Sequence, residues 1–188
     1  MRIIITRHGK TEENKEGIIQ GHLPGVLSDL GKEQARKLAE RLKNEKIGLI
    51  VSSDLARAAD TAREVGKFHS DAKLIFDERM REANFGSFQG MKKGEIDWKS
   101  SEIESRRDMA ERTYSLALEL LEKYSNKTVL LVGHAGINKA LIGRFRENVE
   151  DCFDNLRQGN TCLNILEISE DRKSNEILLN CMRHLDED

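Results

Sequence analysis

Apolar residues fall into two patterns along this chain, and the first is a series of short runs rich in β-branched side chains. Runs of this kind, stopped by polar residues, are typical of strands buried on both faces of a parallel sheet. Clear runs occupy residues 3–5, 47–51 and 128–132, and weaker ones occupy residues 73–76, 162–168 and 177–181. The first pattern therefore predicts strands at these places.

The second pattern is a helical period between those strands. Apolar residues at i, i+3, i+4 and i+7 make one stripe over residues 35–42 and another over residues 55–62. Ser28 and Ser53 precede the two stripes and are the expected N-caps. Two further helices are expected at residues 105–124 and 135–141.

Strands that alternate with helices predict the fold class, an α/β three-layer sandwich whose mainly parallel central sheet is flanked by helices. Residues 1–188 are expected to form a single domain, because the length fits one core and no linker or repeat interrupts the chain. The segment of about residues 86–104 lacks periodicity and contains three glycines, so it is predicted to be a mobile, lid-like loop. The acidic tail 186–188 is expected to fray.

Charge and cysteine content narrow the class of protein. The chain has 31 lysines and arginines against 33 aspartates and glutamates, which removes the electrostatic reason to expect binding to nucleic acid or an anionic membrane. Three cysteines without C-x-x-C spacing predict neither a disulfide framework nor a zinc site and fit a reducing compartment. Since no signal peptide or membrane-spanning stretch is apparent, the expected location is cytoplasmic. The oligomeric state stays open.

Reactive side chains follow three of the predicted strands at their carboxyl ends. Arg7 and His8 end the first strand, Arg57 lies in the helix after the second, and His134 follows the strand at 128–132. In open parallel sheets the carboxyl ends of the strands form the ligand crevice. The two histidines and two arginines are therefore predicted to converge, beside helix N-termini whose free N–H groups favour anions.

Such a set of cations suits a phosphate group. An arginine binds two phosphate oxygens at once, and the backbone after Gly9 and Gly136 can approach closely because glycine has no Cβ. Guanidinium groups disfavour a neighbouring imidazolium, so one histidine can attack phosphorus while the other stabilises charge. Taken singly, a histidine near a strand end is more often structural and Arg57 more often solvated. Their joint placement favours chemistry.

Several motifs recur in order along the chain. Residues 7–14 read R-H-G-K-T-E-E-N, residues 27–35, 52–62 and 131–136 carry L-S-x-x-G-x-x-Q-A, S-S-D-L-x-R-A-x-x-T-A and L-V-G-H-A-G, and Asn160 precedes the strand at 162–168. This ordered set resembles the histidine phosphatase superfamily, phosphoglycerate mutase-like branch, over nearly the whole chain. The resemblance implies the corresponding fold and a metal-independent phosphoric monoester hydrolase without a cofactor.

The resemblance also implies roles for individual residues. His8 corresponds to the nucleophile that becomes a phosphohistidine, and Arg7, Arg57 and His134 to the groups around the phosphoryl. Glu82 matches the proton donor, with Glu78 as the competing assignment. The remaining phosphate- or substrate-binding positions that it implies are Asn14, Gln20, Gly21 and Ala135.

Some positions depart from the family pattern. Lys10 stands where the family usually has Glu or Gln, which puts a third cation beside His8. Residues 23–26 replace the usual D-x-P continuation, and the frequent G-E-S before the long helix appears as Ile103-Glu104-Ser105. These departures concern specificity more than the reaction.

Three functions remain for comparison. The mutases that the chain resembles cover their intermediate with long insertions after the acid segment, whereas only about a dozen residues separate Gly90 from Glu104 here. A phosphomonoesterase acting on a small phosphorylated metabolite is therefore expected, with Lys92 and Lys93 as possible contacts for a second anionic group or as solvated residues. The alternatives are a cofactor-dependent phosphoglycerate mutase and a catalytically silent phosphate-binding module. A metal hydrolase is disfavoured because His22, His69 and His184 are scattered.

Overall fold

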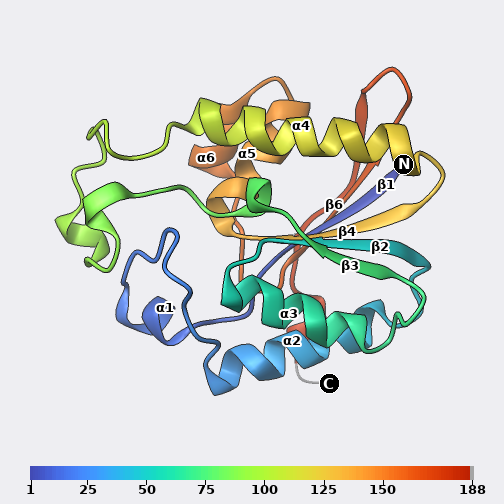
Figure 1. Cartoon of the computed structure of the whole chain (residues 1–188), viewed down its shortest axis with the longest axis horizontal. Coiled ribbons are helices and arrows are strands. Elements are labelled where there is room, and N and C mark those ends of the chain that lie inside the picture. Colours follow the sequence, from blue (N-terminus) through green and yellow to red (C-terminus); the bar gives the residue numbers. More distant parts are fainter. Residues whose placement is uncertain (187–188) are drawn as a thin grey trace.

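A central six-stranded sheet organises the computed structural model, which describes residues 1–186 (Figure 1). The strand order is β3-β2-β4-β1-β5-β6. Strands β3, β2, β4 and β1 pair in parallel, whereas β5 pairs antiparallel with β1 and β6 antiparallel with β5. The strands are β1 (Arg2–Arg7), β2 (Ile47–Ser52), β3 (Lys73–Phe76), β4 (Thr128–Gly133), β5 (Leu163–Ile168) and β6 (Ser174–Cys181). All six predicted strands are confirmed.

Helices cover both faces of this sheet, with α2 and α3 on one side and α4, α5 and α6 on the other (Figure 1). The helices are α1 (Glu12–Glu16), α2 (Asp29–Leu42), α3 (Ala56–Gly66), α4 (Arg106–Tyr124), α5 (Ala135–Phe145) and α6 (Val149–Asn155). The predicted three-layer α/β architecture with a mainly parallel sheet is thus confirmed.

Alternation of side chains along the buried strands divides the core in two. Ile3 and Ile5 of β1 pack on the α4 and α5 side, and Ile4 between them packs against α2 and α3. Every residue of 3–5 is fully buried. Both faces of a central strand therefore require apolar side chains, which is why these strands read as continuous apolar runs.

Helix starts agree with the sequence at one predicted cap and differ at the other. The Ser28 hydroxyl accepts a hydrogen bond from the Gly31 N–H, as predicted for the start of α2. Ser53 is not an N-cap: α3 begins at Ala56, and Leu55 occupies the cap position without a side-chain bond. The Ser53 hydroxyl instead accepts from the Leu55 N–H, 3.2 Å away, because the chain makes a short turn before the helix begins.

Helices α1 and α6 are absent from the predicted pattern. Helix α1 has five residues and buries none of them, so no apolar stripe marks it. Its start is fixed by polar groups: the Thr11 hydroxyl accepts from the Asn14 N–H, and the Asn14 amide oxygen accepts from the Thr11 N–H. Short helices held by such caps leave no periodic signal.

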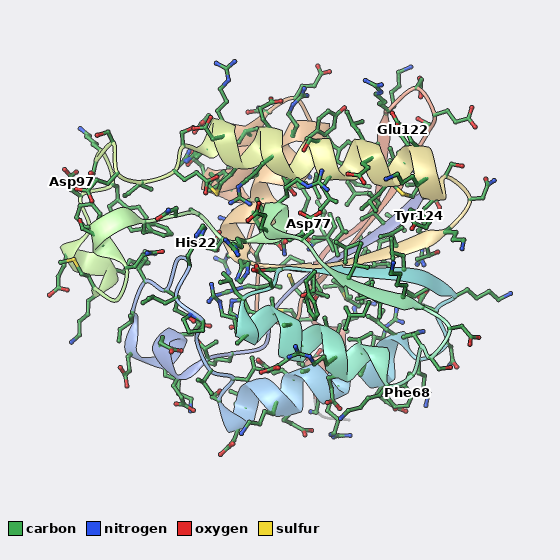
Figure 2. All side chains as sticks on the ribbon, in the orientation of Figure 1. His22, Phe68, Asp77, Asp97, Glu122 and Tyr124 are labelled. Atoms are coloured by element: carbon green, nitrogen blue, oxygen red, sulfur yellow. The ribbon has the colours of Figure 1, made fainter. Side chains whose placement is uncertain are left out.

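Loop 86–104, the segment between β3 and α4 singled out by the sequence, contains no strand and only two short 3-10 turns, Gly86–Phe88 and Lys93–Glu95. It is held against the chain near α1 by the Gly90 N–H, which donates to the Ile19 carbonyl at 2.8 Å, and by the Lys93 N–H, which donates to the Gly17 carbonyl at 3.0 Å. Asp97 marks its outer end (Figure 2). Its mobility stays a prediction.

Two remaining sequence expectations concern the tail and the membrane. Residues 187 and 188 of the acidic tail lie outside the described residues. Within residues 1–186, none of the helices combines the length and the apolar composition that crossing a bilayer demands.

Candidate active site

His8 and His134 meet at the carboxyl ends of the adjacent strands β1 and β4. The His8 N–H donates to the Gly133 carbonyl at 3.0 Å, which ties the two strand ends together. The two imidazole rings lie 5.1 Å apart between centroids, tilted by 59°. The parallel pairing of β1 with β4 therefore delivers both histidines to one place, although they are far apart in the sequence.

The His8 ring has a defined proton arrangement. Its Nδ1 lies 2.7 Å from the carbonyl oxygen of Gly9, and because a carbonyl only accepts, Nδ1 carries the hydrogen. Burial, and then the charges of Arg7 and Arg57, hold the pKa of His8 well below 6.5. The ring is consequently neutral at physiological pH, with an unprotonated Nε2 that has a free electron pair.

His134 has the opposite arrangement. The Arg57 Nε–H donates to His134 Nδ1 at 3.2 Å, so this nitrogen accepts and the hydrogen of the neutral ring is on Nε2. Burial, and then the charge of Arg57, keep the pKa of His134 well below 6.5. The site therefore pairs one histidine with a free acceptor and one with a free donor.

Arg57 is only 1% exposed and is held by backbone carbonyls of the loop after α1. Its Nη1 donates to the carbonyl of Leu23 at 2.5 Å and to that of Pro24 at 3.2 Å, and its Nη2 donates to that of Gly21 at 2.8 Å. Burial lowers the pKa of Arg57 to about 10, so it stays charged at neutral pH. Residues 23–26, which depart from the family pattern, still provide part of this cradle.

Arg7 completes the cationic centre. Its Nη1 donates to the Gln158 carbonyl at 2.9 Å, and burial lowers its pKa. Within residues 1–186, Arg7 Nε and His134 Nε2 are buried without a hydrogen-bond partner. Buried donors without acceptors are costly, and an anion that accepts from them would remove that cost. The arrangement is suited to an oxyanion.

The other predicted phosphate ligands surround this centre in different ways. The Asn14 amide oxygen accepts from the Thr11 N–H, leaving its amide N–H groups as donors, and Ala135 is the first residue of α5, where a helix N–H lacks an intrahelical acceptor. Gln20 donates to the Thr11 hydroxyl at 2.9 Å. Gly21 contributes its carbonyl to Arg57.

Lys10, expected as a third cation beside His8, makes its contacts through the backbone. Its carbonyl accepts from the Ser28 N–H at 2.9 Å and its N–H donates to the Gln34 amide oxygen at 2.9 Å. The charges that lower the pKa of His8 are those of Arg7 and Arg57. The backbone of Lys10 thus helps to anchor α2.

Glu82 lies at the N-terminus of α5, next to His134. Its two carboxylate oxygens accept from the Gly136 N–H at 3.0 Å and the Ile137 N–H at 3.2 Å. The two free N–H groups of a helix start hold a carboxylate well. The close backbone approach at Gly136 is predicted from the sequence for phosphate, but in the structure it is the Glu82 carboxylate that approaches this backbone. A Cβ on Gly136 would lie 2.4 Å from a Glu82 oxygen.

Glu78, the competing acid, is placed differently. Its side chain is 76% exposed and lies 3.6 Å from the Arg81 guanidinium. Among the charged groups around Arg7 and Arg57, Glu82 does most to raise the pKa of each arginine against the effect of burial. Of the two carboxylates, Glu82 is the one that the structure brings to the cationic centre.

A cleft of about 1260 Å³ adjoins the centre at Glu82 and Gly136. Its walls come from the segment after β3, the end of loop 86–104 and the start of α4. Phe85 and Trp98 contact edge to face in it, with ring centroids 6.0 Å apart, and Trp98 is 54% exposed. Lys92 and Lys93 are exposed on loop 86–104 and do not line this cleft.

Three supporting residues had no role assigned from the sequence. The Thr61 hydroxyl accepts from the Gly9 N–H at 3.1 Å, and the Asn160 amide donates to the His8 carbonyl at 2.9 Å. The Gln158 carbonyl receives Arg7. Thr61 and Asn160 stand in the ordered motifs, which is the signal that could have marked them, whereas a backbone carbonyl leaves no signal in the sequence.

A sheet whose carboxyl edge gathers two neutral histidines and two arginines defines the class of α/β proteins that handle phosphoryl groups. Within the described residues, no three His, Cys, Asp or Glu side chains are grouped to hold a metal ion. The chain belongs to the histidine phosphatase superfamily (branch 1), whose sequence model matches residues 3–180.

Named relatives fall within the same family. A glucosyl-3-phosphoglycerate phosphatase from Mycolicibacterium vanbaalenii is 39% identical over 162 residues, which cover 74% of this chain and 72% of the relative. A metal-independent phosphoserine phosphatase from Arabidopsis thaliana is 31% identical over 163 residues, covering 77% and 68%. Among solved structures, a mycobacterial glucosyl-3-phosphoglycerate phosphatase in complex with VO3 superposes with a TM-score of 0.89 at 30% identity, covering 96% of this chain and 99% of that one.

Proposed function

We propose that this protein is a phosphomonoesterase that hydrolyses a small phosphorylated metabolite through a phosphohistidine on His8. The observation that carries this proposal is the neutral His8 ring, with Nδ1–H fixed on the Gly9 carbonyl and Nε2 free beside Arg7, Arg57 and His134. A nucleophile needs a free electron pair, and a transferring phosphoryl group needs cations and N–H donors around its oxygens. The centre provides both.

In the first step His8 Nε2 attacks phosphorus. The P–N bond forms as the P–O bond to the alcohol breaks, and the Glu82 carboxyl transfers its proton to the departing oxygen. Arg7, Arg57 and the Nε2–H of His134 stabilise the negative charge on the three phosphoryl oxygens. Asn14 and the Ala135 N–H supply further donors.

In the second step water attacks the phosphohistidine. The Glu82 carboxylate takes a proton from the water, the new P–O bond forms, and the P–N bond breaks to restore the neutral His8 ring. Phosphate then leaves, and the proton taken from water keeps Glu82 in its acid form for the next cycle. No bound metal is required by this sequence of steps, in agreement with the name of the phosphoserine phosphatase relative.

The alcohol part of the substrate is assigned to the cleft next to Glu82. The cleft opens beside Glu82, the proposed donor to the leaving oxygen, and Trp98 offers an aromatic face against which a sugar or similar group can stack. The relatives' names point to small phosphorylated metabolites, glucosyl-3-phosphoglycerate and phosphoserine among them. The short loop 86–104 favours access of water and therefore hydrolysis over phosphoryl return to the alcohol.

A panel of phosphorylated metabolites, assayed with a chelator present, tests the proposal. The expected result is release of inorganic phosphate from at least one sugar phosphate or phosphoserine, with activity retained in the chelator. Isomerisation of 3-phosphoglycerate faster than its hydrolysis would establish the mutase alternative instead. Binding of phosphate without turnover of any ester would establish the silent binding module.

A further inference from the structure

The ion pair between Arg112 of α4 and Glu104 before that helix stands beside the acid segment that contains Glu82. Arg112 Nε donates to Glu104 Oε1 at 2.6 Å and Arg112 Nη2 donates to Glu104 Oε2 at 3.0 Å, a two-pronged geometry. Only 22% and 18% of the two side chains are exposed. The pair between Arg106 and Glu150 at the same cleft is much more open, at 42% and 69%.

The rest of the Arg112 guanidinium holds backbone of the acid segment. Its Nη1 donates to the Arg79 carbonyl at 2.7 Å, and its Nη2 also donates to the Glu82 carbonyl at 3.1 Å. These two carbonyls flank the turn that leads into Glu82. Arg112 therefore fixes the course of the chain at the residue that carries the proposed proton donor.

Glu104 ties the same segment from a second side. Its Oε2 accepts from the Asn84 N–H at 3.1 Å, and its own N–H donates to the Asn84 carbonyl at 2.8 Å. A third support comes from His22, whose Nε2 lies 2.9 Å from the Glu82 carbonyl (Figure 2). The backbone at residues 82–84 is thus held by α4, by the end of loop 86–104 and by the loop that cradles Arg57.

We propose that Arg112, locked by Glu104, is a positioning residue for Glu82. The clamp of Arg112 and Glu104 sets the backbone of residues 79–84, and the N-terminus of α5 then receives the Glu82 carboxylate in one orientation. Proton transfer to the leaving oxygen depends steeply on distance, and a displacement of 1 Å costs up to about 100-fold in rate. This inference rests on the proposed role of Glu82.

The test compares Arg112→Gln with the unaltered protein on two esters, an alkyl phosphate whose alkoxide needs a proton and an aryl phosphate whose phenolate does not. The variant is expected to lower kcat for the alkyl ester by about 10- to 100-fold and for the aryl ester by less than about threefold. In an E82Q background, Arg112→Gln should lower kcat for the alkyl ester by less than about twofold, because Glu82→Gln has already removed the proton transfer that Arg112 supports.

Two matched variants separate positioning from charge. Arg107→Gln removes another arginine of the same helix, one that is exposed and does not line the cleft, so it should leave the ratio of alkyl to aryl turnover unchanged. Arg112→Lys keeps the positive charge, which helps to lower the pKa of His134, but one ammonium cannot hold Glu104 and both carbonyls together. Most of the alkyl-specific loss should therefore persist. Full recovery with lysine, or an equal rise in KM for both esters, would overturn the proposal.

Amide hydrogen exchange tests whether the clamp of Arg112 and Glu104 holds the backbone, even if neither ester is hydrolysed. The N–H groups of Ala83 and Asn84 are bonded to Glu82 and Glu104, not to Arg112, so their exchange reports the clamp indirectly. Arg112→Gln should speed their exchange at least about tenfold, and Arg107→Gln should not. Unchanged exchange at both positions would refute the clamp, whereas absence of turnover in the unaltered protein would refute only the proposed function.

Discussion

The cationic centre and the cleft beside it are built in opposite ways. His8, Arg57 and His134 of the centre are 3%, 1% and 0% exposed, and all are fixed by strand ends or backbone carbonyls. Trp98 of the cleft is 54% exposed and sits on loop 86–104, which has no strand to fix it. The two histidines thus lie at strand ends of the sheet, whereas Trp98 of the cleft lies on a loop.

Charge follows the same division. The arginines that line the cleft are paired with carboxylates: Arg79 with Asp77, Arg81 with Asp54, Arg106 with Glu150 and Arg112 with Glu104. In the centre, Arg57 is held instead by neutral carbonyls and an imidazole, so its charge is not balanced by a contacting carboxylate. An anion is therefore best accommodated in the centre rather than beside the paired arginines of the cleft.

Replacement of His8 by Asn should cause the largest loss of turnover of all the substitutions. Removal of the nucleophile is expected to lower kcat by about a thousandfold or more on every ester. Arg7 and Arg57 remain, so the variant should still bind inorganic phosphate, which calorimetry can measure as a control for folding. Retained turnover in a folded variant would remove His8 from the mechanism.

Glu82→Gln should separate the two regions, because Glu82 stands where they meet. The amide keeps the size of the side chain but cannot deliver the proton, so alkyl phosphates should lose about 100-fold in kcat and aryl phosphates much less. Glu78→Gln is the matched control and should change neither. Equal losses for both ester classes would exclude Glu82 as the general acid.

The pH profile tests the electrostatics of the centre. Protonation would remove the electron pair of His8, and its pKa lies well below 6.5 because of burial and the neighbouring arginines. After allowance for the substrate's own ionisation near pH 6, kcat/KM should stay level as pH falls through 6.5 and decline only at lower pH. An acid limb centred at or above 6.5 would show that the histidine is not held neutral.

The same depressed pKa values predict how stability depends on pH. The unfolded chain binds a proton on each of the two histidines more readily than the folded chain does. Their contribution to the free energy of unfolding should therefore be complete above pH 6.5 and decrease as the pH drops below it. His184 adds to this trend, since burial lowers its pKa to about 4. Urea melts between pH 7 and 4 measure the slope, and a free energy of unfolding that stays constant over this range would contradict the predicted linkage.

Trp98→Ala should have the smallest effect and should be confined to the cleft. Loss of the aromatic face is expected to raise KM for a sugar phosphate by about two- to fivefold, without changing inhibition by inorganic phosphate. Phe76→Ala offers a control, because Phe76 is also exposed but lies on β3 beside Arg63. A matching rise in the inhibition constant for phosphate would mean that the cleft and the centre are not separate.

The sequence predicted the sheet and the main helices because burial on one or both faces imposes a period. It also predicted which cations the strand ends collect, since parallel strands finish at one edge. It could not predict the cap of α3, where Ser53 serves a turn and Leu55 takes the cap position. Helix α1 was missed because polar capping, not an apolar stripe, defines it.

The contacts that hold the site residues in place were harder to predict than the residues themselves. Arg57 is held by the carbonyls of Gly21, Leu23 and Pro24, and backbone groups are present in every residue. The role of Gly136 differed for a related reason, because the free N–H groups at the start of α5 bind the Glu82 carboxylate and a sequence does not show which anion arrives there. Residue type indicates which groups react, and three-dimensional packing decides what holds them.

Trapping of the phosphoenzyme is the most direct test of the central claim. An alkyl phosphate labelled in its phosphoryl group should be mixed with the protein, quenched within milliseconds in alkali and digested for mass spectrometry. The predicted result is one phosphoryl group on the imidazole of His8, stable to base, labile to acid and absent from His8→Asn. Steady turnover with no label on His8, or with the label on another residue, would contradict the account.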